Sequence, residues 1–151
     1  MSDLDPEKFK IRLQALDEYK GILKETQPTP RDEFISNVRV YGLAERYLHL
    51  AIETLIDLAH LLVAGLGWRR PVDNADAMIV LAEQRVVPRD FADTLARMVR
   101  FRNILVHVYL DIDRSLVYEV LQNRLGDFDR FAECLRRFLV DELQIDMGSS
   151  E

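Results

Sequence analysis

The chain has 151 residues, of which 48% are hydrophobic and 30% are charged, and it contains only six glycines and five prolines. This composition excludes a disordered or fibrous chain and predicts a soluble globular protein with one hydrophobic core. The net charge of −6 argues against a protein that coats nucleic acid nonspecifically, because such affinity comes mostly from lysine and arginine contacts with phosphates. We expect a single domain over residues 1–145 and a disordered tail over residues 146–151.

The sequence favours neither export nor insertion into a membrane. It begins without the positively charged segment and apolar run of a signal peptide. Its most apolar stretch, residues 51–68, is interrupted by Glu53, Asp57 and His60, which makes it a poor membrane span. We therefore expect a cytoplasmic protein that has no contact with a membrane.

The first half of the chain predicts two helices. Asp5 followed by Pro6 is typical of a helix start, and apolar residues at near-helical spacing extend this helix to about Thr26. Thr29 and Pro30 begin a second helix by the same capping pattern. Two apolar stripes run along this helix to about residue 66, so we expect it to be covered on two sides.

The second half predicts three more helices, over residues 74–87, 89–110 and about 113–139. An N-cap at Asn74 begins the first of them, and Pro88 ends it. Asp111 or Asp113 caps the last one, in which Gly126 is a candidate bend. Because no pattern favours strands and the loops are short, we expect an all-α, antiparallel up-and-down bundle of four to five helices.

The run FRNILVHVYLD places Arg102, Asn103, His107 and Tyr109 in an otherwise apolar helix. On an ideal helix Asn103 and His107 share one stripe with Arg100, whereas Arg102 lies about 140° from His107. One straight helix therefore cannot aim Arg102 and His107 at a single small target. The last turn could unwind near Tyr109, long side chains could reach around the helix, or a second copy could supply the missing partner across a two-fold axis. We favour the second copy, and so expect a homodimer with one composite cleft.

Positive charge accumulates around this motif. Between Gln84 and His107 five arginines stand against two aspartates, a net charge of +3 in a chain that is acidic overall. The region carries no glycine-rich phosphate loop, no serine in a nucleophile elbow and no carboxylate cluster for a metal. Histidine near a helix C-terminus suits proton transfer, and the arginine fork suits phosphate oxygens. The motif therefore indicates acid and base chemistry on a phosphate group, with no requirement for a metal or a cofactor.

A second polar stripe lies on the long predicted helix. Arg46, His49, Glu53, Asp57 and His60 fall within about 80° of one another on an ideal helix. We interpret this stripe mainly as a solvated face with pairs four residues apart. There are two alternatives. Arg46, His49, Glu53 and Asp57 could form a wall of the cleft, or the stripe could bind a metal.

These features resemble those of HepT-like proteins of the HEPN superfamily. The similarity extends over residues 47–139 and includes YLHLAIETLIDLAH, PVDNADAMIVLAEQRVVP and RMVRFRNILVHVYLDID. It implies an all-α HEPN bundle that forms homodimers and acts as a metal-independent ribonuclease, the toxin of a pair whose antitoxin is a small nucleotidyltransferase. By this resemblance Arg102 and His107 would be catalytic, Asn103 would support them, and Tyr109 would carry the hydroxyl that the antitoxin adenylylates.

The sequence thus predicts a metal-independent endoribonuclease toxin. In RNA the 2′-hydroxyl supplies the nucleophile, so the protein needs only acid/base groups and stabilising charges. We expect His107 to transfer protons and Arg102 to stabilise the phosphorus centre, supported by Asn103, Tyr109 and Arg100. Adenylylation of Tyr109 would neutralise the toxin by adding negative charge and bulk beside the cleft. The alternative is a non-catalytic helical module that binds a nucleotidyltransferase partner.

Overall fold

The computed structural model describes residues 4–107 and 113–148, apart from the side chains of Val106 and His107. Its elements are α1 (Pro6–Thr26), α2 (Arg31–Ser36), α3 (Val38–Gly65), α4 (Asn74–Glu83), α5 (Arg89–His107), α6 (Arg114–Asn123), α7 (Leu125–Arg137) and a π-helical turn, η1 (Phe138–Glu142). The described residues contain no strand, which confirms the all-α prediction. The expected homodimer stays a prediction, because the structure is that of one chain.

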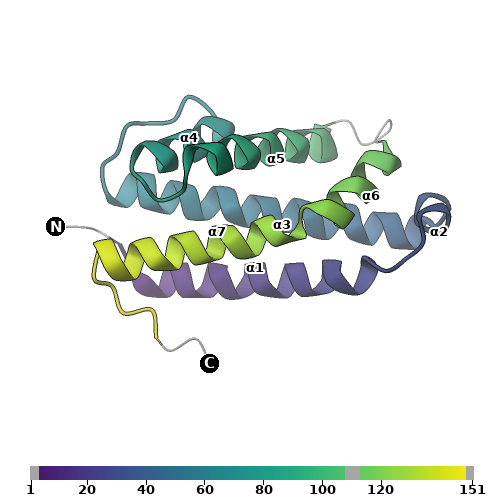
Figure 1. The fold of residues 1–151 in the computed structure, drawn as a ribbon, viewed down its shortest axis with the longest axis horizontal. Helices are drawn as coiled ribbons and strands as arrows, with labels where there is room; N and C mark the ends of the chain where they lie inside the picture. The colour runs from purple at the N-terminus through teal and green to yellow at the C-terminus, as the bar shows by residue number, and fades with distance from the viewer. Residues whose placement is uncertain (1–3, 108–112, 149–151) are drawn as a thin grey trace.

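α3 is the central helix and contacts each of the other α-helices. Its fully buried side chains include Leu48, Ile52, Leu55, Leu58 and Leu62. Figure 1 shows α1 and α7 on one side of α3, and α4 and α5 on the other, so both apolar stripes are covered as predicted. Within the described residues α3 is also the one helix long and apolar enough to cross a membrane, and 56% of its most apolar window is buried inside the bundle.

The long second helix that the sequence predicts is in fact two helices. The backbone at Asn37 is extended, with φ −104° and ψ 104°, and this residue separates α2 from α3. The Asn37 side chain accepts a hydrogen bond from the backbone N–H of Arg39 at 3.0 Å, while its own N–H donates to the carbonyl oxygen of Glu33. One asparagine thus ends one helix and caps the next, because its short amide competes with the helical hydrogen bonds.

The last predicted helix is also divided, and the break differs from the one expected. The chain turns at Arg124, between α6 and α7, with φ −119° and ψ 0°, whereas Gly126 lies inside the first turn of α7. No atom outside its own helix would lie within 4 Å of a Cβ added at Gly126, so nothing in the packing requires a glycine there. The Arg124 guanidinium lies 3.6 Å from the Asp127 carboxylate across this junction.

Two of the predicted caps are confirmed, at α1 and α6, whereas the cap predicted at Thr29 is wrong, because α2 begins after Pro30 without a side-chain cap. The Asp5 carboxylate accepts a hydrogen bond from the N–H of Glu7 at 3.0 Å, and Asp113 caps α6 in the same way. The cap of α4 is one residue earlier than expected, because the Asp73 carboxylate accepts from the N–H of Asp76 at 2.7 Å. In the described part of the tail Met147 packs against the core, and the rest of the predicted tail, residues 149–151, lies outside the described residues.

Candidate active site

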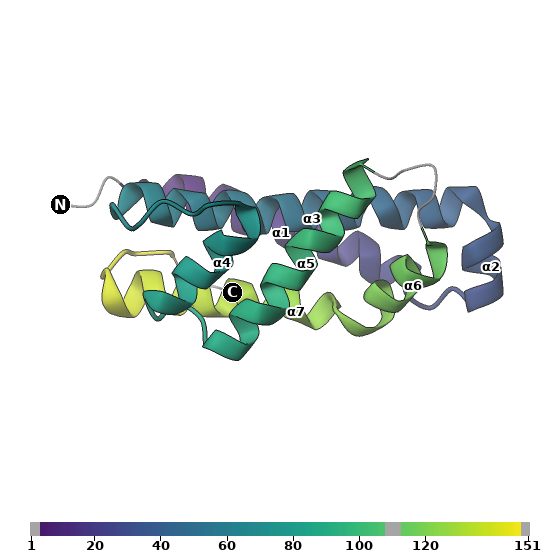
Figure 2. The same ribbon diagram turned by 90° about the horizontal axis from the view of Figure 1, so that it is seen from above.

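The apolar face of α5 fixes the direction in which its polar side chains point. Phe91, Leu95, Val99 and Leu105 are buried against the bundle, and each such burial contributes about 1.5–3 kcal/mol. Figure 2 shows α5 crossing α3 obliquely, with its C-terminal half over the middle of α3. This crossing brings the polar motif of α5 next to the polar stripe of α3.

Arg102 and Glu53 form an ion pair across the α3–α5 crossing. The Arg102 Nε donates to Glu53 Oε2 at 2.7 Å, and Nη2 lies 2.6 Å from the same oxygen. The remaining terminal nitrogen, Nη1, donates to the side-chain oxygen of Asn103 at 3.1 Å. The Arg102 side chain is 18% exposed and that of Glu53 is 35% exposed, so the pair lies at the rim of the bundle and solvent reaches it. All three guanidinium nitrogens therefore contact protein side chains, while the group stays partly exposed to solvent.

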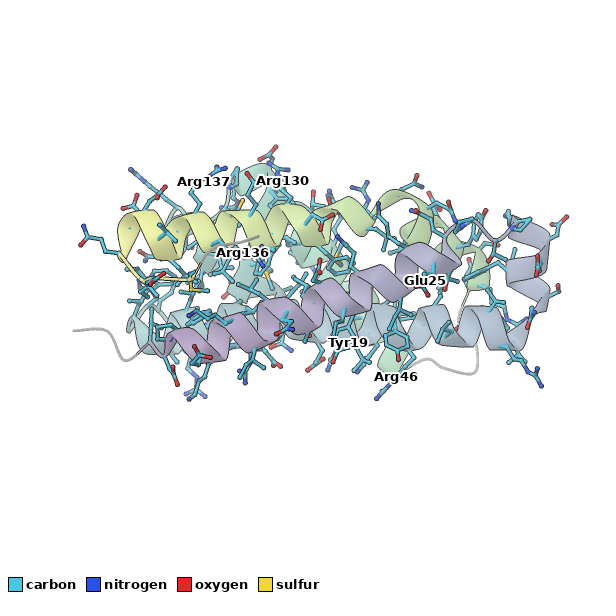
Figure 3. The ribbon with its side chains drawn as sticks, turned by 90° about the horizontal axis from the view of Figure 1, so that it is seen from below. Tyr19, Glu25, Arg46, Arg130, Arg136 and Arg137 are labelled. Carbon is cyan, nitrogen blue, oxygen red and sulfur yellow. The ribbon has the colours of Figure 1, made fainter. Side chains whose placement is uncertain are left out.

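His49 lies near this ion pair, one helical turn before Glu53 on α3. Partial burial lowers the pKa of His49 below its ordinary value, and the positive charges of Arg102 and Arg46 lower it further against the opposing charge of Glu53. The lowered pKa favours the neutral imidazole, in which one ring nitrogen donates and the other accepts a hydrogen bond. Figure 3 shows Arg46 on the edge of α3, pointing away from the bundle.

The two remaining members of the polar stripe have different surroundings. Burial raises the pKa of Asp57, and the nearby negative charge of Glu53 raises it further. The His60 Nε2 donates to the side-chain oxygen of Asn74 at 2.9 Å, at the start of α4. The described residues contain no group of three or more histidine, cysteine, aspartate or glutamate side chains placed to hold a metal. Within this stripe, His49 and Glu53 thus lie near Arg102, whereas His60 contacts the start of α4.

Comparison with known proteins shows the family to which the chain belongs. Residues 13–135 match the family model described as Ribonuclease HepT-like. The chain belongs to the HepT-like ribonuclease family. It is 24% identical over 140 residues to a tRNA nuclease HepT of Aphanizomenon flos-aquae, which covers 93% of this chain and 95% of that protein. It is 29% identical over 89 residues to an mRNA nuclease HepT of Shewanella oneidensis, which covers 59% of this chain and 67% of that protein.

Solved structures share the fold of this HepT-like chain. The cytosolic protein YutE of Bacillus subtilis superposes with a TM-score of 0.85 at 23% identity, covering 99% of both chains. A tri-AMPylated HEPN toxin of Shewanella oneidensis, solved in complex with an MNT antitoxin, superposes with a TM-score of 0.77 at 22% identity, covering 90% of this chain and 98% of that one. The HEPN-like fold predicted from the sequence is thereby confirmed.

The structure of this HepT-like chain brings some of the predicted site residues together. Arg102 and Asn103 contact each other and lie with Glu53 at the α3–α5 crossing, whereas Arg100 is exposed and faces a groove beside α6. The backbone of α5 is helical through His107, whose side chain lies outside the described residues, as does all of Tyr109. The direct pairing of Arg102 with Glu53 was not predicted, because periodicity placed Glu53 on a stripe without showing which helix would cross it.

Proposed function

We propose that this HepT-like protein is a metal-independent endoribonuclease toxin whose active site forms between two copies of the chain. The observation that carries the proposal is the Arg102 guanidinium, held by Glu53 and Asn103 at the solvent-accessible rim of a bundle that belongs to a ribonuclease family. A guanidinium held in one orientation can bind two phosphate oxygens and stabilise the charge that develops on them.

In the proposed reaction the RNA 2′-hydroxyl attacks the adjacent phosphorus atom. A base removes the hydroxyl proton, an acid protonates the departing 5′-oxygen, and the products are a 2′,3′-cyclic phosphate and a free 5′-hydroxyl. His107 is the proposed proton-transfer group, and Arg102 neutralises the pentacoordinate phosphorus. Each step uses only protons and fixed charges, so no metal or cofactor enters the scheme.

The shape of α5 supports a composite site. Because α5 is helical through His107, the two catalytic positions diverge by about 140° around its axis. Unwinding of the helix before His107 is therefore not a way to bring them together. A two-fold axis beside α5 would place the Arg102 of one copy near the His107 of the other.

Cleavage in the presence of a chelator tests the proposed activity. We expect the purified protein to cut single-stranded RNA at the same rate with and without EDTA, and to leave 2′,3′-cyclic phosphate ends. Activity that disappears with EDTA and returns with added Mg²⁺ would contradict the metal-independent mechanism. Absence of any cleavage by a folded, unmodified dimer would contradict the ribonuclease proposal itself.

We further propose that a nucleotidyltransferase antitoxin neutralises the protein by adenylylating Tyr109. Support comes from the similar Shewanella toxin, which is tri-AMPylated in its complex with an MNT antitoxin. An added AMP would bring negative charge and bulk close to the cleft. We expect intact mass to rise by one or more AMP units after co-expression with a cognate nucleotidyltransferase, and the Tyr109→Phe variant to lose the modification at that position. An unchanged mass pattern in Tyr109→Phe would place the modification elsewhere.

A second candidate function is a non-catalytic module that binds a nucleotidyltransferase. The Arg102–Glu53 ion pair favours it, because a guanidinium already neutralised by a carboxylate is a weaker phosphate ligand. Binding of the partner by a protein that never cleaves RNA would support this alternative. Either function is consistent with a cytoplasmic protein, a proposed location that the similarity to the cytosolic YutE supports.

A further inference from the structure

A groove lies between the C-terminal half of α5 and the helix α6. Figure 2 shows the two helices side by side in this part of the molecule. The groove has a volume of about 320 Å³, which is within the range of small-ligand sites. It lies on a different side of α5 from the Arg102–Glu53 pair, and it reaches Ile104, one helical turn before His107. A ligand at the Ile104 end of the groove would therefore lie within about one turn of the proposed catalytic histidine.

The floor of the groove is apolar and partly open to solvent. Phe101 contributes a mostly buried ring, and Ile104 and Leu116 remain 39% and 37% exposed. Large aliphatic side chains at this exposure offer a flat surface to another apolar group. A nucleobase presents such a face, and unpaired bases bind proteins largely by stacking on aromatic and apolar side chains.

The rim of the groove is positively charged. Arg97, Arg100 and Arg124 line it, and no acidic side chain does so among the residues that the structure describes. Asp127 lies behind the rim, 3.6 Å from Arg124, and the Arg97 guanidinium donates weakly to the Thr94 hydroxyl at 3.4 Å. This local charge opposes the net charge of −6 on the whole chain. The groove therefore favours an anionic ligand.

The same charges argue against a second copy of the chain as the occupant. In a two-fold interface centred on this groove, three arginines of one copy would face the same three arginines of the other, and such like-charge contacts are unfavourable. A single-stranded nucleic acid instead brings phosphates for the guanidinium groups and a base for the apolar floor.

We propose that the α5–α6 groove binds an unpaired nucleotide of the RNA strand beside the scissile bond, with its base on Ile104 and Leu116 and its phosphates on the three arginines. This inference rests on the proposed ribonuclease function and extends it to substrate positioning. The groove would hold the strand, and Arg102 and His107 would act on the adjoining phosphodiester.

The test compares two triple variants of equal net charge. In one, Arg97, Arg100 and Arg124 are replaced by Gln; in the control, the exposed Arg39, Arg70 and Arg136, which lie outside the groove, are replaced by Gln. The probe is a fluorescent single-stranded 2′-O-methyl RNA, which lacks the nucleophile and cannot be cleaved, so binding is measured independently of catalysis. We expect the groove variant to bind at least about tenfold more weakly than the control, and its slope of log Kd against log salt to fall by about 2, as for the loss of three phosphate contacts.

A second variant tests the apolar floor. We expect Ile104→Gln to weaken binding of the base-containing probe while leaving an abasic probe of the same length unaffected. Equal binding of the probe by the groove and control triple variants would overturn the inference, even if RNA cleavage is normal. Weaker binding by the groove variant alone would support it, even if cleavage is absent. Dissociation of a dimer by Ile104→Gln in light scattering would also overturn it, because the groove would then be an interface between copies.

Discussion

Replacing His107 with alanine is expected to reduce RNA cleavage by a factor of about 10² to 10⁴, the usual contribution of a positioned acid or base. The helical circular dichroism and the mass in solution should stay those of the unaltered protein, because the change removes one side chain near the end of α5. His60→Ala is the matched control, since His60 contacts Asn74 at the start of α4, away from the α3–α5 crossing. Full cleavage by a clean His107→Ala preparation would remove this histidine from the mechanism.

Mixing two inactive variants tests whether the site is composite. An Arg102→Ala chain keeps its histidine and a His107→Ala chain keeps its arginine, so a mixed dimer would have one complete site if the two groups come from opposite copies. After subunit exchange we expect recovery of roughly a quarter of the normal activity, because about half of the dimers are mixed and each mixed dimer keeps one of the two Arg102–His107 pairs in the cleft. No recovery from subunits shown to exchange would mean that one copy supplies both groups.

Local chemistry made the helix boundaries partly predictable. Asp5 and Asp113 act as caps through hydrogen bonds to residues two or three positions away, and the sequence contains all the information for such contacts. Asn37 was missed because its surroundings continue the apolar stripes on both sides, and periodicity alone does not show that a short amide interrupts a helix. The bend predicted at Gly126 is absent, because a glycine within a helix is tolerated when the neighbouring residues pack well.

The site was predictable only as two separate stripes. The sequence placed Arg102 on one helix and Glu53 on another, but their contact depends on the angle at which α5 crosses α3, which the packing of buried side chains determines. The α5–α6 groove depends on tertiary packing in the same way, because Leu116 and Arg124 come from α6 and its junction with α7. The motif therefore indicated the proposed chemistry, whereas the fold determined that Glu53 is the charged group that contacts Arg102.

Glu53→Gln is expected to lower kcat for RNA cleavage by about tenfold to a hundredfold while leaving KM unchanged or reduced. The amide keeps the shape of the side chain but loses the charge that holds Arg102 at 2.6 Å, and small displacements of a catalytic group cost up to about 10² in rate. Removal of a carboxylate beside the cleft also removes repulsion of RNA phosphates, so binding should not weaken. Glu53→Asp keeps the charge and should recover part of the lost rate.

The pKa of His49 gives this prediction a readout that loss of stability alone would not produce. Glu53 is the group that raises the His49 pKa against burial and against the charges of Arg102 and Arg46. Glu53→Gln should therefore move the His49 titration to lower pH, and Glu53→Asp should move it back, as followed by NMR of the ring protons. Glu45→Gln alters a half-buried glutamate that lies two turns before Glu53 on α3. This variant should change neither kcat nor the His49 titration. A proportional loss of activity and melting temperature in all three variants, with no shift of the His49 pKa, would show that Glu53 is only structural.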